Sequence, residues 1–360
     1  MSSRNLLWIF IFFLITSLVV ALHHSCYRLV FDPKKYDLIK LIGYTPPDGF
    51  YTYNPSVLYD KIRNRIYFSI RVSNKGCDTD PLVVQNMLLM IYVNVTRLED
   101  LKPEKIIESR LHRNIHPPVG GCCNTGIEDI RLWSHQGELY GIGSYVMNTT
   151  PVGDKTNVQI QPTCKNRMVI VKFDPDSLEI IETIQVSYGN GRNEKNWAPV
   201  IGPIEKDLQH RLPLFVYNWD PYIVIAWDPS CIAGGKMTQW KSETITDMTN
   251  RGVVNISNLK NCRGGSQVVY TSDQGYMAVV HTRDIAGKNY RHYLVYLDTN
   301  LDITAVSDSF CIDMQTSDPT LCGIEFVSGA AEITDGTVVV TYGAKDCTAN
   351  VAVLDITTSI

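Results

Sequence analysis

The sequence predicts an all-β fold, a five-bladed β-propeller, because short strands follow one another along the chain and polar clusters return at a regular spacing. From about residue 45 onward, stretches rich in β-branched and aromatic residues alternate with Gly, Pro, Asn and Asp, which is typical of strands and turns. One short helix is expected, at residues 98–108. The clearest expected strands are residues 66–72, 168–173, 222–226, 277–281 and 337–342.

The polar clusters set the expected number of blades. Neighbouring clusters lie roughly 65 to 75 residues apart, a length that accommodates a four-stranded antiparallel blade, and blades repeated around an axis form a propeller. Because the inner strands start at the central channel, the five clusters are expected to converge on one pocket. A pair of β-sandwiches with unrelated turns is the alternative. The marker residues of the five clusters are Asn54, Asp129, Asn196, Gly264 and Gly329.

The N-terminus indicates export. Arg4 precedes an uncharged apolar run, residues 6–22, that has about the length a helix needs to cross a membrane. The run is either an uncleaved signal anchor or a signal peptide cut near Ala21, and the anchor is favoured because the run is long for a signal peptide. We therefore expect a type II membrane protein of the ER or Golgi lumen, or a secreted protein if the signal is cleaved. The expected organisation is a signal segment at 1–25, a lead-in at 26–47 and the propeller at 48–360.

Cysteines and glycosylation triplets agree with export. The ten cysteines are dispersed, without a CxxC pair or a histidine at zinc spacing, so disulfides are expected and a metal cluster is not. Asn94, Asn148 and Asn255 each begin an Asn-x-Ser/Thr triplet, the acceptor sequence of a glycoprotein. A net charge of −4 argues against a nucleic-acid partner, and no cluster calls for a metal or an organic cofactor.

The cluster at residues 126–131 carries the main candidate for catalysis. Two acids stand beside an arginine there, a pattern that a half-buried strand does not explain. Asp129 is the candidate for proton transfer to a glycosidic oxygen, with Glu128 as a substrate contact and Arg131 as the contact for an anion or a sugar hydroxyl. An ion pair that ties two blades together is the structural alternative.

Three further clusters supply candidate binding residues. Trp197 is expected to stack on a sugar face, and Glu194 is a candidate catalytic base. The Gly-Gly step after Arg263 would let the backbone approach a ligand closely. The expected substrate contacts from these clusters are Lys195, Asn196, Trp197, Arg263 and Asp346.

Four short motifs stand in order along the chain: Asn-Pro-Ser at residues 54–56, Arg71, Gly-Ile-Glu-Asp-Ile-Arg at residues 126–131, and Tyr-Gly-Ala-Lys-Asp at residues 342–346. They resemble the motifs of glycoside hydrolase family 130, which comprises mannoside phosphorylases with related β-mannosidases and β-1,2-mannosyltransferases. The resemblance runs from about residue 48 to the end of the chain. It implies that Asp129 is the general acid and that Arg71 and Arg131 contact phosphate or the sugar. Ile130 stands where that family usually has proline.

Asn54 bears on the type of reaction. Related furanosidase-type propellers place an aspartate base just before a Pro-Ser step in the first blade, and an amide cannot accept a proton in its place. A hydrolase would therefore need its base from Glu194 or Glu325. Transfer of a sugar to or from phosphate does not need such a base, because phosphate is itself a good nucleophile or leaving group when cations hold it. The candidate cations are Arg131, Lys195 and Arg263.

Together these features favour a glycosyl-transferring enzyme of the secretory pathway, a glycosyltransferase or glycoside phosphorylase that moves a mannosyl-type sugar with an activated or phosphorylated donor. The expected partners are an oligosaccharide or glycoconjugate substrate, a sugar phosphate or phosphate, and the membrane through the N-terminal segment. Two alternatives stay open. One is an inverting hydrolase of mannosides with Asp129 as acid and Glu194 as base; the other is a lectin-like propeller that binds a glycan without turnover.

Overall fold

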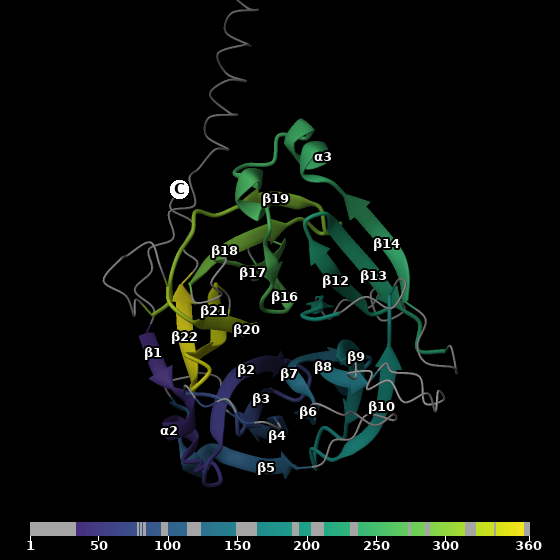
Figure 1. Ribbon diagram of the computed structural model, residues 1–360. Helices are drawn as coiled ribbons and strands as arrows, with labels where there is room; N and C mark the ends of the chain where they lie inside the picture. Colours follow the sequence, from purple (N-terminus) through teal and green to yellow (C-terminus); the bar gives the residue numbers. More distant parts are fainter. Residues whose placement is uncertain are drawn as a thin grey trace, which may run out of the picture.

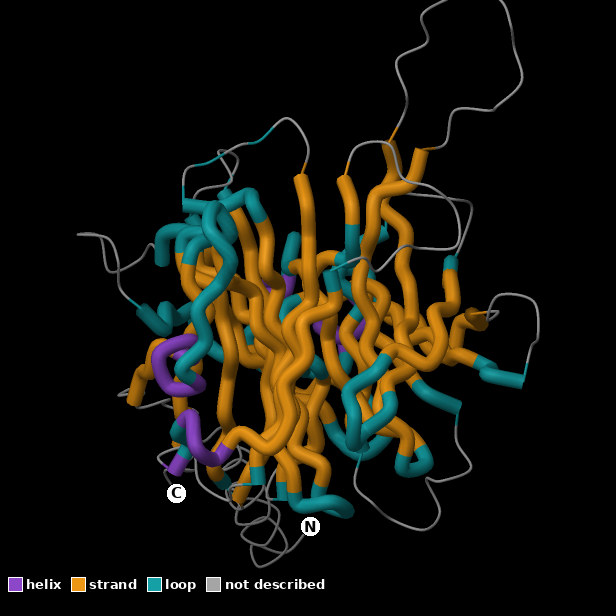
Figure 2. The backbone as a smooth tube through the Cα atoms, turned by 90° about the horizontal axis from the view of Figure 1, so that it is seen from below, coloured by secondary structure: helices purple, strands orange, loops and turns teal. Residues whose placement is uncertain are grey.

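The computed structural model confirms the all-β propeller. It describes residues 34–355 apart from 78, 80, 82–83, 95–99, 114–123, 149–163, 189–193, 203–211, 231–236, 273–274, 285–288, 314–321 and 335. Within these residues, five four-stranded antiparallel blades surround a central axis (Figure 1). Seen from the side, the strands run between two ends of the ring, where the turns and loops lie (Figure 2). The expected signal segment lies outside the described residues and stays a prediction.

In blades 1 to 4 the strands follow the order of the chain from the axis outward. Blade 1 comprises β2 (Tyr51–Asp60), β3 (Arg65–Ser73), β4 (Val84–Val93) and β5 (Ile106–His112). Blade 2 comprises β7 (Glu128–His135), β8 (Glu138–Asn148), β9 (Cys164–Phe173) and β10 (Ile180–Val186). Blade 3 comprises β11 (Ala198–Ile201), β12 (Leu214–Trp219), β13 (Tyr222–Trp227) and β14 (Met237–Glu243). Blade 4 comprises β16 (Val268–Thr271), β17 (Gly275–Arg283), β18 (Tyr290–Leu297) and β19 (Ile303–Val306).

Blade 5 is built from both ends of the described chain. It comprises β20 (Glu325–Thr334), β21 (Thr337–Ala344), β22 (Thr348–Asp355) and the early strand β1 (Lys34–Asp37). β1 comes from the segment expected to be only a lead-in, so the propeller begins before residue 48. The inner strands β2, β7, β11, β16 and β20 contact one another in a closed ring, and two short strands, β6 (Asn124–Thr125) and β15 (Arg263–Gly264), pair with β4 and β17.

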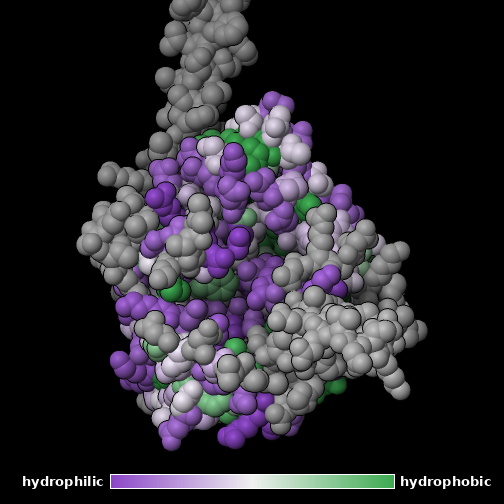
Figure 3. Space-filling view, viewed as in Figure 1, coloured by the Kyte–Doolittle hydropathy of each residue, from purple (hydrophilic) through white to green (hydrophobic). Residues whose placement is uncertain are grey.

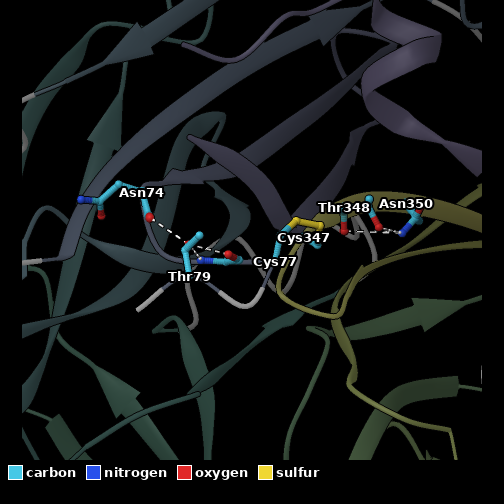
Figure 4. The surroundings of a disulfide bond; sticks show 7 residues. Asn74, Cys77, Thr79, Cys347, Thr348 and Asn350 are labelled. Atoms are coloured by element: carbon cyan, nitrogen blue, oxygen red, sulfur yellow. Dashed lines mark hydrogen bonds between the residues drawn. A yellow bond between two sulfur atoms is a disulfide. The ribbon is translucent and has the colours of Figure 1, made fainter. Parts of the chain in front are cut away.

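Two features join the first blade to the last. β1 pairs antiparallel with β22, so an N-terminal strand completes the C-terminal blade. A disulfide between Cys77 and Cys347 links the loop after β3 to the turn between β21 and β22 (Figure 4). A second disulfide, Cys311–Cys322, closes a loop before β20, whereas Cys262 is a buried free thiol. The expectation of disulfides is confirmed for these two pairs.

A separate hydrophobic core fills the space between each pair of neighbouring blades. Along β3, Ile66 and Phe68 belong to the core shared with blade 5, while Tyr67 between them belongs to the core shared with blade 2. Side chains alternate between the faces of a strand, so both faces of the blade are buried. This explains why the strands read as almost continuous apolar runs rather than as alternating ones.

The side chain of Gln267 ties three blades together at the axis. Its amide nitrogen lies within hydrogen-bond distance of the Ser56 hydroxyl (2.7 Å) and of the carbonyls of Val57 (2.9 Å) and Leu132 (3.0 Å). Its amide oxygen accepts a hydrogen bond from the N–H of Ala330 (3.0 Å). Gln267 precedes β16, so one fully buried residue of blade 4 links blades 1, 2 and 5.

The helical segments are short. They are α2 (Leu38–Ile42), α3 (Ile245–Asn250) and the 3₁₀ turns η2 (Pro103–Lys105) and η3 (Ile256–Leu259). The helix expected at residues 98–108 is wrong where that segment is described, because Pro103 opens a single turn and the β-branched Ile106 and Ile107 start β5. In the described part of the chain, no helix has the length and apolar character to cross a membrane.

Replacing Gln267 with Ala is expected to destabilise the propeller. The change leaves buried carbonyls and a buried N–H of three different blades without their partner, and each such group costs about 1–3 kcal/mol. We expect the free energy of unfolding to fall by at least about 2 kcal/mol in chemical denaturation.

Gln85, whose side chain is exposed on β4, supplies the matched control. Gln85→Ala should stay within about 0.5 kcal/mol of the wild type. Equal stability of the two variants would show that the axial amide does not hold the blades.

Candidate active site

Three polar residues at equivalent places on neighbouring blades adopt a left-handed backbone. They are Asn54 in β2 (φ 49°), Asp129 in β7 (φ 53°) and Asn196 just before β11 (φ 62°). Asn and Asp tolerate this conformation better than other non-glycine residues do. The register of β2 with β3, and of β7 with β8, shifts at the first two, as in a β-bulge that redirects a side chain. The spacing of the polar clusters thus reflects one backbone feature repeated on successive blades.

The carboxylate of Asp129 is the centre of a polar cluster. Its Oδ1 accepts hydrogen bonds from Asn54 Nδ2 (2.9 Å) and from the guanidinium of Arg71 (3.1 Å). The Nε of Arg71 in turn donates to Asn86 Oδ1 (2.8 Å) on β4. A Cβ at Gly343 would collide with the Asn54 amide, so glycine in β21 leaves the room that this amide needs. The structure therefore brings together Asn54, Arg71 and Asp129, and the roles that the resemblance implies for Arg71 and Asp129 stay predictions.

Glu128 connects the same cluster to a third blade. This buried acid lies with Oε1 3.3 Å from the Arg71 guanidinium and Oε2 3.1 Å from Lys195 Nζ. Lys195 precedes blade 3, and 43% of its side chain is exposed, so its ammonium remains open to a ligand. The ion pairing between blades that the sequence left as the structural alternative is thus present, beside the polar cluster.

Charges around Glu128 and Asp129 decide their protonation. Burial raises the pKa of each, but the charge of Arg71 opposes it, aided by Lys195 and, for Asp129, by the Asn54 hydrogen bond. The net pKa of each acid is lowered, so both are ionised at neutral pH. Burial lowers the pKa of Arg71, but the two acids outweigh it and the net pKa is raised.

Arg131 is buried inside the ring of inner strands, where it binds neighbouring blades. It is 1% exposed, and its Nε donates to the carbonyl of Gly265 at 2.6 Å. Its other nitrogens lie 3.2 Å from the Asp129 carbonyl and 3.4 Å from Asn196 Oδ1. The ring of Phe326 faces the guanidinium, and burial lowers the pKa of Arg131 to about 10. These bonds make Arg131 a link between blades, and its expected contact with an anion stays a prediction.

Asp346 is a second acid close to the cluster. It is half-buried after β21, beside the Cys77–Cys347 disulfide. Burial raises the pKa of Asp346, and the charge of Asp129 raises it further. Two neighbouring carboxyls therefore have pKa shifts in opposite directions, a pattern that separates acid from base roles in active sites.

Trp197 lies in the wall between blades 2 and 3 and not in the cluster. It is 1% exposed, and its indole packs against Phe215 and Tyr217. The expected stacking of Trp197 on a sugar is therefore corrected, because the ring has no open face. Trp197 follows the left-handed Asn196, and successive residues of a strand face opposite sides, so it points into the core.

Glu194 also belongs to this wall. It is 2% exposed, its Oε1 accepts a hydrogen bond from the N–H of Tyr188 (3.0 Å), and its Oε2 has no hydrogen-bond partner among the described residues. Burial raises the pKa of Glu194. The structure describes no contact between Glu194 and Asp129, so the two candidate catalytic acids are not brought together.

The rim of blade 4 adds exposed cations to the site. Arg263 and Arg283 are exposed, and Arg263 is paired with His281 across β15 and β17. Arg283 hydrogen-bonds Tyr290, whose pKa is raised by burial and by the charges of Asp346 and Asp129. Tyr290 of blade 4 therefore lies near Asp129 and Asp346. In the space-filling view, hydrophilic residues surround a hollow at the middle of the ring (Figure 3).

Sequence reasoning missed two residues that shape the cluster. The ring of Tyr53 lies under the Arg71 guanidinium, 5.0 Å from its centre, and burial raises the pKa of Tyr53 to about 12. Asn86, which holds the other side of Arg71, is 1% exposed. An amide within the apolar run of β4 was the available signal for Asn86, whereas a tyrosine in a buried strand gives none.

Chemically, the cluster can accept a proton and hold an anion. Asp129 is an ionised acceptor, while Lys195 and Arg263 present cations that solvent can reach. In the described residues, no group of three or more His, Cys, Asp or Glu is arranged to hold a metal ion.

Comparison with known proteins finds similar folds. No protein-family model matches the chain, and no curated protein does. A mannose phosphorylase from Leishmania mexicana in complex with phosphate is 15% identical, with 86% of this chain and 85% of that chain covered and a TM-score of 0.44. A GDP-Man-dependent mannosyltransferase from the same organism is 14% identical, with 86% of both chains covered and a TM-score of 0.49. The NanB sialidase of Streptococcus pneumoniae is 9% identical (86% and 69% covered, TM-score 0.45). These similarities assign no activity to this chain.

Replacing Glu194 with Gln is expected to stabilise the protein increasingly as pH rises. The folded-state pKa of Glu194 is raised, so wild-type stability is lost as pH climbs from the ordinary value of about 4.3 through the folded value. The amide has no charge to bury and can still accept from Tyr188. The gain in melting temperature over wild type should therefore be larger at pH 8 than at pH 4.

Glu182→Gln, on the exposed face of β10, is the matched control and should show no such trend. A gain for Glu194→Gln that is the same at both pH values would contradict the raised pKa.

Proposed function

We propose that this protein transfers a mannosyl-type sugar from a phosphorylated or nucleotide-activated donor to a hydroxyl of a glycan acceptor. The observation that carries the proposal is the environment of Asp129. Asn54 and Arg71 hold its Oδ1 and keep the carboxylate ionised, next to cations that solvent can reach. An ionised carboxylate can accept a proton, which is what activation of an acceptor hydroxyl requires.

In the proposed step, Asp129 takes the proton of the acceptor hydroxyl. The acceptor oxygen forms a bond to the anomeric carbon of the donor while the bond from that carbon to the phosphate oxygen breaks. The phosphate or nucleoside diphosphate leaves as an anion and needs no protonation. Lys195 and Arg263 stabilise its charge from the open side of the site. Asp346, with its raised pKa, is suited to hydrogen-bonding a sugar hydroxyl.

Hydrolysis with Asp129 as the general acid is disfavoured, because none of the three residues considered as its base is placed to act as one. Asn54 is an amide whose N–H donates a hydrogen bond to Asp129. Glu194 is buried in the wall between blades. Glu325, 0% exposed, accepts hydrogen bonds from the backbone N–H groups of Ile312 and Asp313. A general acid would also need a proton that the lowered pKa of Asp129 does not retain at neutral pH.

The proposed setting is the lumen of the secretory pathway. Disulfides persist in oxidising compartments, and two are present in the described residues. The apolar N-terminal run supports the same route as a signal anchor or a signal peptide. Activated sugar donors and glycan acceptors meet in such a lumen, which suits transfer better than phosphorolysis.

A donor screen on the protein tests the proposal. Mannose-1-phosphate, nucleotide sugars, and manno-oligosaccharides with phosphate are offered with a glycan acceptor, and products are read by mass. We expect transfer from one of the activated donors, reduced about 10²–10⁴-fold in Asp129→Asn because the proton acceptor is lost. Asp48→Asn, an exposed change outside the site, should keep full activity.

Two outcomes would overturn the proposal. Release of free mannose from manno-oligosaccharides without any activated donor would establish the hydrolase alternative. Binding of glycans by wild type and Asp129→Asn with no product from any donor would leave the lectin-like alternative in its place.

A further inference from the structure

A large cavity lies at the opposite mouth of the central channel from the Asp129 cluster. Its volume is about 1130 Å³, and it is lined by the far ends of the inner strands, with Leu58 of β2, Val269 of β16 and Ala331 of β20 among its apolar residues. The polar cluster stands at the near ends of these strands. Gln267 crosses the axis between the two, so the mouths are separate sites.

The rim of this cavity exposes large apolar side chains. Six such residues are exposed among those the structure describes, and three line this one mouth: Ile62 (63% exposed), Leu212 (41%) and Trp240 (47%). Tyr270 adds a second aromatic ring that is partly exposed. Exposed apolar and aromatic groups that gather around a concave site indicate a binding site for a ligand or partner, whereas singly scattered ones do not.

Charges at this mouth cancel within the protein. The ammonium of Lys61 lies 3.7 Å from Glu332, whose other oxygen accepts from the N–H and hydroxyl of Ser272. Asp60 is paired with Arg63 at 2.8 Å. These pairs leave hydrogen-bonding groups but no net charge for a ligand, in contrast to the open cations of the Asp129 cluster.

Burial lowers the pKa of His135, so this ring is neutral near pH 7. The amide side chains of Gln136 and Asn300 also line the mouth. The charged groups of the lining, Asp60, Lys61 and Glu332, are thus paired, and His135 is neutral.

From this lining we infer that the cavity binds a neutral oligosaccharide. A sugar ring presents an apolar C–H face, which suits the exposed indole of Trp240, and hydroxyls, which suit the amides and the Lys61–Glu332 pair. The volume exceeds the roughly 300–1,000 Å³ of typical small-ligand pockets, so there is room for several sugar units. The site binds a glycan without reacting with it. This inference does not depend on whether the other mouth is catalytic.

Binding of neutral manno-oligosaccharides to the full chain, measured by calorimetry, tests the inference. Trp240→Ala should weaken binding about tenfold, the loss expected for an aromatic stacking contact. Trp240→Phe should recover most of the affinity because it keeps a ring. Asn300→Ala should weaken binding by a smaller factor, and Ile107→Ala, an exposed apolar change on β5, should have no effect.

Measuring both transfer activity and oligosaccharide binding in each variant separates this inference from the proposed function. Trp240→Ala should leave transfer to a short acceptor unchanged, and Asp129→Asn should leave this binding unchanged. Equal affinity of wild type, Trp240→Ala and Asn300→Ala would overturn the inference. So would loss of all oligosaccharide binding in Asp129→Asn, because a single site at the first mouth would then explain it.

Discussion

The amide of Gln267 is the contact on which the geometry of the ring depends most. Apart from β11 with β16, the described inner strands of neighbouring blades share no backbone ladder, so side chains must hold them together. Gln267 joins three blades with one group, and the hydroxyls of Ser69 and Ser328 add single bonds to neighbouring backbones. This axial layer also divides the channel, which is why the molecule has two mouths of different chemistry.

The fold was predictable because it repeats. A polar residue at the start of each inner strand returns with every blade, and three of these residues share a left-handed backbone that Asn and Asp tolerate. The closing strand β1 could not be seen, since its pairing with β22 joins residues at opposite ends of the chain. Lys34–Asp37 is also too short and polar to read as a strand.

The sequence predicts which charged residues meet at the candidate site, but not where each side chain points. Asn54, Arg71 and Asp129 meet because the amide and the guanidinium both donate hydrogen bonds to the carboxylate. Trp197 does not join them, because one residue along a strand reverses the face. Arg131 stands in the right motif, yet its buried guanidinium binds protein carbonyls. Sequence indicates which groups are near the axis, whereas only the backbone decides which of them remain open to a ligand.

The transfer that we propose requires a phosphorylated sugar to bind at the Asp129 mouth. A crystal structure of the protein with mannose-1-phosphate tests it most directly. We expect phosphate density beside Lys195 and Arg263, with the anomeric carbon toward the Asp129 carboxylate. Sugar phosphate bound only at the Trp240 mouth, or no bound sugar at a concentration that supports transfer in solution, would contradict it.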